Sequence, residues 1–194
     1  MNFARTLRKI SKPMILVANK IDTEKAKENY NKLKKELSNE IIIPCSADSE
    51  LALREASKKG VIDYIPGERS FKIKPEFEDK LSDKQKQALE SIQKKVLDVF
   101  EEGTGVQSVL NCAVFSLLKY IAIFPASPNK LADSKGNILP DCFLLPQGST
   151  ALDFAYSLHT DIGKNFIKAI DARTSRALGK DYVLKHRDAL EIIN

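Results

Sequence analysis

The chain has 194 residues, with 31 Lys and Arg against 26 Asp and Glu, so its formal charge is +5. Its hydrophobic share of 43% and charged share of 29% are typical of a soluble globular protein of one or two domains. No apolar run approaches the roughly 18 residues of a membrane helix, and the N-terminus has no secretory signal pattern, so a cytoplasmic, non-membrane protein is expected. The three cysteines, Cys45, Cys112 and Cys142, form no CxxC pair and indicate neither a disulfide framework nor a metal site.

The first part of the chain predicts a parallel α/β layer. Two short apolar runs, residues 13–19 and 40–45, are typical of strands buried on both faces. A helical pattern follows each run, at residues 23–37 and 49–59. One face of the first helix carries Ala26, Tyr30, Leu33 and Leu37. Strands that alternate with helices favour parallel pairing.

The middle of the chain, residues 76–118, predicts a helical hairpin. Ser82 and Gln85 form a capping-box pattern before one amphipathic helix. Thr104 and Gln107 form a second such pattern after a glycine break. Two consecutive amphipathic helices joined by a tight turn indicate an αα-hairpin.

Residues 119–194 predict a small α+β sheet with one crossing helix. Strands are expected at residues 120–124, 138–145, 166–170, 182–184 and 189–193. Pro140 predicts an edge or a bulge in the second of them. The helix follows Gly148, and Thr150 and Asp153 are its expected capping pair. Its inner face is expected to carry Leu152, Ala155, Tyr156 and Leu158.

The sharpest motif, Asn19-Lys20-Ile21-Asp22, comes directly after the first expected strand. Guanine presents its N1–H and 2-amino group as a two-donor edge, and one ionised carboxylate, Asp22, can accept both. Adenine presents an acceptor at N1, which leaves the carboxylate unpaired at a cost of about 1–3 kcal/mol. Lys20 can lay its aliphatic stem against the base, and Asn19 can brace the loop and reach the purine edge.

A second loop supports this interpretation. The letters CSAD at residues 45–48 follow the next apolar strand, which brings Ser46 and Ala47 toward the same base. A backbone N–H near Ala47 can donate to the guanine O6. The alternative is that Asp22 only caps a helix in an ordinary strand-to-helix loop.

Three stretches carry a resemblance to known families. The segments KPMILVANKID and IPCSADSELALREASKKGVIDYIPG resemble the guanine-specificity half of a GTPase of the Obg/YchF-like group. The segment LLPQGSTALDFAYSLHTDIGKNFIKAIDART resembles a TGS domain, the ubiquitin-like β-grasp module. Because its NKxD motif is intact, the chain is most similar to archaeal-type relatives that keep guanine specificity. The resemblance implies a truncated Ras-like G-domain remnant (residues 1–75), a helical hairpin (76–118) and a TGS β-grasp domain (119–194).

The resemblance also implies a function. Such proteins are translation- or ribosome-associated and bind GTP or GDP with Mg²⁺ in their complete form. Their phosphate loop, GxxxxGK[ST], and their DxxG switch precede NKxD. Here 18 residues precede Asn19, and the letters DSKG at residues 133–136 follow NKxD in a polar loop. We therefore expect no catalytic residue, no hydrolysis and no tight nucleotide binding in these 194 residues. The alternative is a stand-alone TGS module that binds RNA or the ribosome without nucleotide.

Two further surfaces invite interpretation. A basic face on the TGS domain is a candidate RNA or ligand site, although scattered Lys and Arg are usually only a solvated surface. Its members are Lys164, Lys168, Arg173, Arg176, Lys180, Lys185 and Arg187. His159 and Asp161 are expected to fix a turn, and His186 to have no special role. The outer edge of the strand at residues 13–19 predicts either a homodimer or a covering helix from residues 2–10.

Overall fold

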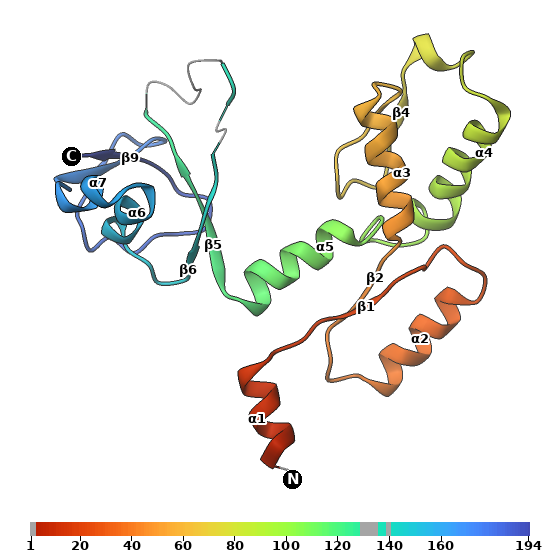
Figure 1. Cartoon of the computed structure of the whole chain (residues 1–194), viewed down its shortest axis with the longest axis horizontal. Helices are drawn as coiled ribbons and strands as arrows, with labels where there is room; N and C mark the ends of the chain where they lie inside the picture. The colour runs from red at the N-terminus through yellow and green to blue at the C-terminus, as the bar shows by residue number, and fades with distance from the viewer. Residues whose placement is uncertain (1–2, 129–135, 139–140) are drawn as a thin grey trace. The chain divides into compact units, whose positions relative to one another are not determined.

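The computed structural model describes residues 3–128, 136–138 and 141–194. The chain divides into two compact units, unit 1 (Met1–Ala113) and unit 2 (Val114–Asn194) (Figure 1). Pro140 and the DSKG letters before Gly136 lie outside the described residues, so the bulge and the turn expected there stay predictions. Within the described ranges, no helix combines the length and the apolar character that crossing a bilayer requires.

Two short parallel strands form the first sheet of unit 1, as predicted. β1 (Leu16–Ala18) and β2 (Ile42–Pro44) pair along their whole length. α2 (Ala26–Glu36) connects them, and α3 (Ala47–Lys58) follows β2. Parallel strands need such a crossover helix, because a tight turn cannot reverse the chain twice.

Helix α2 buries less of its apolar face than its sequence predicts. Tyr30 packs with Ile21 and Phe100 in a small core. Leu33 and Leu37, expected on the same inner face, are 41% and 38% exposed. A two-stranded sheet is too narrow to cover a helix of three turns, so the second half of the helix face stays in solvent.

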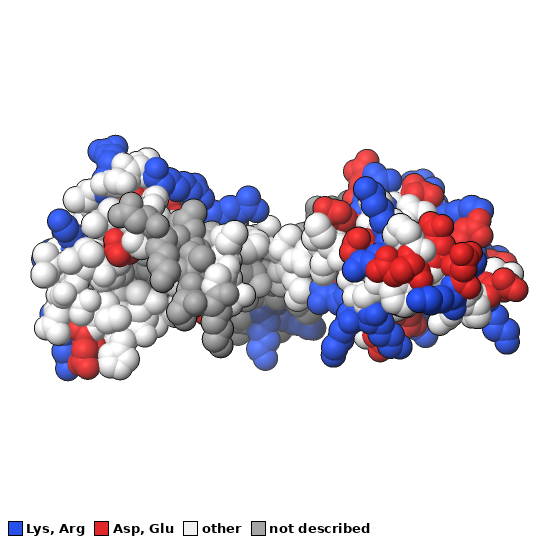
Figure 2. Space-filling view, turned by 90° about the horizontal axis from the view of Figure 1, so that it is seen from above, with Lys and Arg blue, Asp and Glu red and all other residues white. Residues whose placement is uncertain are grey.

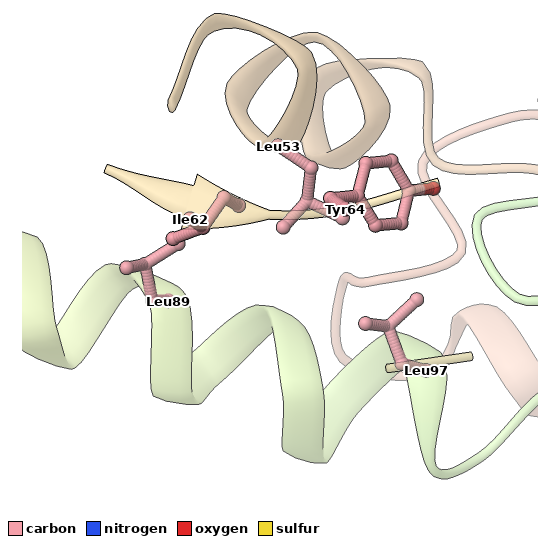
Figure 3. Packing of buried hydrophobic residues seen from close by; sticks show 5 residues of the cluster. All are labelled: Leu53, Ile62, Tyr64, Leu89 and Leu97. Carbon is pink, nitrogen blue, oxygen red and sulfur yellow. The ribbon is translucent and has the colours of Figure 1, made fainter. Parts of the chain in front are cut away.

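A second core of unit 1 forms around a hairpin that the sequence did not predict. β3 (Ile62–Asp63) and β4 (Lys72–Ile73) pair antiparallel, and a 3-10 turn, η1 (Pro75–Phe77), precedes α4 (Asp83–Ile92). Strands of two residues give no periodicity to recognise. Figure 3 shows the buried side chains that α3, β3, α4 and their neighbours contribute to this core, Leu53, Ile62, Tyr64, Leu89 and Leu97.

The helices of the middle segment follow each other as predicted, with one correction. Ser82 and Gln85 make the expected capping box at α4, which continues into a π-helical turn, η2 (Gln93–Leu97). α5 (Val106–Asn111) continues into η3 (Cys112–Leu117). The second predicted capping box is wrong, because Thr104 does not cap α5.

Gly105 occupies the cap position of α5 instead, and no side chain bonds there. The Thr104 hydroxyl donates to Glu50. The core that α4 joins contains residues of α3, β3 and β4 and none of α5. The two helices are therefore consecutive but belong to different packing arrangements.

Unit 2 is one mixed five-stranded sheet in the order β6-β5-β9-β7-β8. β5 and β9 pair in parallel at its centre, and the other neighbours pair antiparallel. The strands are β5 (Tyr120–Pro125), β6 (Phe143–Pro146), β7 (Lys168–Asp171), β8 (Ala177–Leu178) and β9 (Ala189–Ile193). α6 (Ala151–Leu158) and the short α7 (Thr160–Lys164) connect β6 to β7.

The structure corrects two details of the sheet in unit 2. Residues 182–184 were expected to form a strand, but Val183 makes only an isolated bridge to Thr150. β8 was expected to be part of a connecting loop. Because β8 pairs with the outer side of β7, it closes the sheet as an edge strand that is too short to predict.

Helix α6 begins at the predicted capping pair of Thr150 and Asp153. Ala155 and Leu158 of the predicted inner face do pack in the core, but the prediction omitted Phe154 and included Tyr156. Phe154 is fully buried and contacts the ring of Phe143, whereas Tyr156, expected inside, is 48% exposed. The error arose because Phe154 shares the helix with apolar residues on nearly every side, so that the periodicity alone did not fix the buried face.

The N-terminal segment forms a helix, α1 (Phe3–Ser11). A helix here is what the second expected alternative, a helix that covers the strand edge, required. This helix does not cover the open edge of β1. Phe3 and Leu7 are 79% and 54% exposed, and Val17 on β1 is 44% exposed. Phe3 and Leu7 of the helix and Val17 of β1 therefore remain largely in solvent in the single chain.

Candidate functional site

Two loops that follow β1 and β2 meet at one end of the parallel sheet. The Asn19 side-chain carbonyl accepts hydrogen bonds from the Lys20 N–H at 2.8 Å and the Ala47 N–H at 3.2 Å. The Ser46 hydroxyl donates to Asp22 at 2.8 Å. The structure thus brings together all five residues that the sequence analysis assigned to guanine.

Backbone pairing explains why these loops meet. The carboxyl ends of parallel strands lie at the same edge of a sheet, where ligands commonly bind. The pairing continues past the strands, because the Cys45 N–H donates to Ala18 and the Ile21 N–H donates to the Cys45 carbonyl, at 2.9 and 3.1 Å. The two loops are therefore fixed to each other before any ligand arrives.

Lys20 adopts a left-handed backbone conformation with φ of 62°. For a residue with a Cβ this conformation costs about 1–2 kcal/mol. The hydrogen bond from its N–H to the Asn19 side chain and the bond from the Thr23 N–H to its carbonyl offset this cost. The backbone of the loop is held in an unusual turn, as is common at binding sites.

The carboxylate of Asp22 is half-buried and keeps accepting capacity. One oxygen accepts the Ser46 hydroxyl, and the hydroxyls of Ser46 and Ser49 lie 2.8 Å apart. Since Ser46 has a single hydroxyl proton, Ser49 donates to Ser46 in this arrangement. Among the described residues, nothing donates to the other oxygen of Asp22. This oxygen is available for a two-donor ligand edge.

A buried charged network lies directly behind the second loop. Glu50, in the first turn of α3 and 4% exposed, accepts hydrogen bonds from Arg54, Tyr64 and Thr104 at 2.6, 2.7 and 2.6 Å. Burial by itself raises the pKa of Glu50, but the bonds from Thr104, Arg54 and Tyr64 and the Arg54 charge outweigh it and lower the pKa. The carboxylate is therefore charged and fully used within the protein.

The same network affects the groups around Glu50. Burial, followed by the hydrogen bond to the Glu50 carboxylate, raises the pKa of Tyr64 to about 12. Burial and the nearby charge of Glu50 also raise the pKa of the Cys45 thiol. Both groups are neutral near pH 7, so they add no charge to the pair of Glu50 and Arg54.

The sequence analysis did not single out Glu50 or Tyr64, and it assigned Thr104 to a helix cap. One signal was present, because Glu50 lies three residues before the buried Leu53 and so shares its face of α3. A charged residue on the apolar face of a helix is typical of a paired buried group. Nothing in the sequence around Thr104 pointed to Glu50, which lies 54 residues earlier.

The basic residues assigned to unit 2 do not share one face. Arg173 and Arg187 are close, because the Arg173 guanidinium donates to the Arg187 carbonyl at 2.9 Å. Lys168 on β7 precedes Ala169, which is buried with the core, so strand alternation places Lys168 on the opposite face of the sheet from α6. Lys164 ends the short helix α7. The remaining three, Arg176, Lys180 and Lys185, lie in the exposed loops between β7 and β9.

Figure 2 agrees with this distribution. Much of the visible face of unit 2, on the left, is uncharged, and Lys and Arg lie toward its margins. On unit 1, on the right, charges of both signs are intermingled. The described residues of this face therefore present no continuous basic field.

The two histidines of unit 2 have structural roles. His159 caps α7 by accepting the Asp161 N–H, as the sequence predicted. His186 was expected to have no special role, but its ring accepts the Ala122 N–H at 3.1 Å and packs on Phe115, with ring centroids 4.7 Å apart. Across the described ranges, no cluster of His, Cys, Asp and Glu forms a candidate metal site.

Comparisons with known proteins identify the family of this chain. Residues 17–127, more than half of the chain, match the family model of the Obg-like GTPase YGR210-like, G4 motif-containing domain. The chain belongs to this family of Obg-like GTPases. Residues 134–194 match the TGS domain. The Obg-like chain thus joins a G-domain-like region to a TGS domain, whose mixed sheet is consistent with a β-grasp, and the family inferred from the sequence is confirmed.

Relatives of the Obg-like chain are GTP-binding proteins by name. It is 46% identical over 195 residues to an uncharacterised GTP-binding protein of Methanocaldococcus jannaschii. This alignment covers 100% of the chain and 48% of that protein. The chain is 35% identical over 147 residues to an uncharacterised GTP-binding protein of Schizosaccharomyces pombe, and covers 35% of it. The chain therefore spans half or less of the length of these curated relatives.

Solved structures show the same relationship. A GTP-binding protein from Pyrococcus horikoshii aligns with a TM-score of 0.67 at 40% identity, over 98% of the Obg-like chain and 48% of that protein. The YchF GTPase of Schizosaccharomyces pombe aligns with a TM-score of 0.54 at 14% identity, over 94% and 44% of the two chains. The second likeness shows the shared fold alone.

Proposed function

We propose that this chain is the guanine-recognising and TGS-bearing part of an Obg-like GTP-binding protein. Asp22 accepts the N1–H and 2-amino group of guanine, and Lys20 covers the base face. Asn19 and Ser46 hold the two loops together, and the Ala47 N–H turns from Asn19 to the guanine O6. The observation that carries the proposal is the pair of hydrogen bonds that join residues 19–22 to residues 46–47.

Specificity follows from the pairing of Asp22. One of its oxygens is held by Ser46, which orients the carboxylate, and its other oxygen keeps its lone pairs. Adenine would direct its N1 lone pair at this carboxylate, and an unpaired charged group costs about 1–3 kcal/mol or more. We therefore expect the site to prefer guanine over adenine by about tenfold or more.

Affinity is expected to come mostly from elsewhere in a complete relative. Phosphate and Mg²⁺ contacts supply most of the binding free energy and the hydrolytic machinery in nucleoside triphosphatases. These 194 residues contain no GxxxxGK[ST] motif. We propose GTP or GDP with Mg²⁺ as the ligand of the complete protein, and weak guanine binding without hydrolysis by this chain alone.

A nucleotide titration tests the guanine site. Chemical shifts of the backbone amides of residues 18–23 and 45–48 are followed as GMP or AMP is added to the full chain. We expect these amides to shift with GMP and much less with AMP. Asp22→Ala should remove the difference, whereas Asp79→Ala, an exposed carboxylate of unit 1, should retain it. Equal responses to GMP and AMP in the unmodified chain would refute the proposal.

We also propose that the TGS unit binds RNA, in the cytoplasm and in association with the ribosome. The proximity of Arg173 to Arg187 supports a small basic site at the β7–β8 turn. The double charge reversal Arg173→Glu with Arg176→Glu should weaken binding of a structured RNA, and the loss should shrink at high salt. The double reversal at Lys164 and Lys168 changes the net charge equally and is the control. Equal losses in both variants would favour a non-specific charge effect.

Two structural proposals complete the function. We propose that the chain has three functional parts, residues 1–75, 76–118 and 119–194, so that the helical segment is a part of its own.

We further propose that the open edge of β1 pairs with a second copy of the chain, supported by the exposure of Val17. Light scattering should then show a dimer that Val17→Lys disrupts, and a monomer at high concentration would exclude it.

A further inference from the structure

We propose that Glu50, Thr104 and Gly105 form a brace that positions the guanine loop, residues 45–47. This proposal rests on the guanine site proposed above and adds three positioning residues to it. The brace connects α3 and the loop before α5 to the end of β2. None of its members lies in the NKxD or CSAD letters.

The first contact of the brace is through the backbone. The Ser46 N–H donates to the Thr104 carbonyl at 2.8 Å. This bond ties the residue that orients Asp22 to a segment 58 residues later in the chain. A shift of Thr104 would therefore move Ser46 and with it the carboxylate that reads the base.

The second contact fixes the Thr104 side chain. Its hydroxyl donates to the buried Glu50 carboxylate at 2.6 Å, and Thr104 is 0% exposed. Arg54 and Tyr64 occupy other acceptor positions of the same carboxylate. Because all three donors converge on one charged group, Thr104 has a single favourable position, set by α3.

The third contact requires glycine. Gly105 has a φ of 80°, and a Cβ on it would lie 1.9 Å from the Pro44 carbonyl oxygen. The backbone of the brace therefore touches the end of β2 directly, where any side chain would force the loop away. Gly103, with a φ of 61°, also has a left-handed backbone, and a Cβ on it would lie 3.2 Å from the Glu68 carbonyl oxygen. The contact at Gly105 is therefore the tighter of the two.

A loss of the brace is expected to act on specificity more than on folding. The loop would keep its bond between Asn19 and Ala47, but Ser46 would lose its fixed backbone partner. Asp22 would then sample several orientations, and its advantage for the two-donor edge of guanine would fall. Binding that does not depend on the base edge would change little.

The test compares Thr104→Val with Thr104→Ser in the full chain. Valine has nearly the shape of threonine but no hydroxyl, whereas serine keeps the hydroxyl. We expect Thr104→Val to weaken GMP binding about fivefold, to leave AMP binding unchanged, and to speed amide exchange at Ser46. Thr104→Ser should restore both the GMP preference and the slow exchange. Ile62→Val perturbs the adjacent core without touching the brace and should leave both readouts unchanged.

The outcomes separate the two proposals. If the unmodified chain prefers GMP, and Asp22→Ala abolishes this preference but Thr104→Val does not change it, the guanine site stands and the brace is refuted. If the unmodified chain shows no preference for GMP, the proposed function fails, and exchange at Ser46 alone decides the brace. Exchange that Thr104→Val leaves unchanged, or that Ile62→Val accelerates equally, overturns the positioning role.

Discussion

Units 1 and 2 build their candidate binding surfaces in different ways. In unit 1, Asp22 and Asn19 of one loop accept a hydroxyl and a backbone N–H from residues 24 and 28 positions later, and a buried carboxylate fixes the second loop from behind. In unit 2, the basic residues are exposed and lie on several different elements, and one close pair, Arg173 and Arg187, is held by a contact from the Arg173 side chain to the Arg187 carbonyl. A base edge is read by directed hydrogen bonds, whereas a phosphate backbone is attracted by charge that needs less exact placement.

The hydrophobic cores of the two units also differ in how they are built. Unit 2 surrounds one five-stranded sheet, and Phe154, Ile123 and Leu190 are almost completely buried. Unit 1 is divided between two small sheets of two strands each, and leaves Val17 and Ile41 each 44% exposed. A core that is small in apolar area depends more on polar groups that must be exactly paired. Unit 1 therefore carries the more specific candidate site, and its buried side chains are divided between separate clusters.

The largest expected effect comes from truncating one buried side chain in the core of each unit. Phe154→Ala should destabilise unit 2 by about 4 kcal/mol, and Leu53→Ala should destabilise unit 1 by about 3 kcal/mol, since each removes a fully buried side chain. Urea unfolding followed by backbone NMR reports each unit separately. If the units are independent, each variant should broaden or shift only the signals of its own unit. Loss of both units in one variant would show that they fold cooperatively.

A pH titration should distinguish the buried charge of unit 1 from the surface charges of unit 2. Because the folded state lowers the pKa of Glu50, its stabilising contribution is present above the pKa of the unfolded chain and is lost as the pH falls through the folded pKa. Unit 1 should therefore lose stability as the pH falls below the ordinary glutamate pKa of about 4.3. Glu50→Gln should cost about 2 kcal/mol at pH 7 and flatten this dependence.

The measurement for this prediction is the urea midpoint of unit 1 at a series of pH values. Asp63→Asn is a suitable control, because this exposed carboxylate is also in unit 1 and pairs only with Lys74 at 3.5 Å. An unchanged acid dependence in Glu50→Gln would show that other carboxylates dominate the acid response.

The smallest expected effect compares the two capping boxes. Ser82 caps α4 in unit 1 and Thr150 caps α6 in unit 2, each by accepting the N–H of the third helical residue. Ser82→Ala and Thr150→Ala should each cost about 1 kcal/mol in the thermal stability of their own unit. The bridge of Thr150 to Val183 is a backbone pairing that alanine retains, so the two losses should be similar. A larger loss at Ser82 would indicate that unit 1 depends more strongly on its helix ends.

Local signals in the sequence predicted the elements that stabilise themselves. The capping boxes at Ser82 and Thr150 and the strand at residues 189–193 were placed correctly, because cap chemistry and strand patterns act within a few residues. The hairpin of β3 and β4 was missed, because its strands exist only through their pairing. The buried face of α6 was predicted only in part, because the packing of Phe154 on Phe143 of the sheet could not be read from the helix alone.

The candidate site also has a part that local sequence signals predicted and a part that they did not. The letters of residues 19–22 and 45–48 predicted which side chains would meet, because each loop directly follows a recognisable strand and parallel strands end at one edge. The same reasoning assigned Thr104 to a helix cap, since its own neighbourhood offers a capping pattern. In the folded chain the buried carboxylate of Glu50 is the stronger acceptor and takes the Thr104 hydroxyl.

By itself the sequence determined the family, the order of the main elements and which residues we propose to read a guanine edge, because motifs and caps are local chemistry. The tertiary structure alone decided how those residues are held. Glu50 meets Tyr64 and Thr104 across 14 and 54 residues, and Gly105 reaches Pro44 across 61. Such contacts depend on where packing places distant backbone segments, and neither partner carries a local signal for the other.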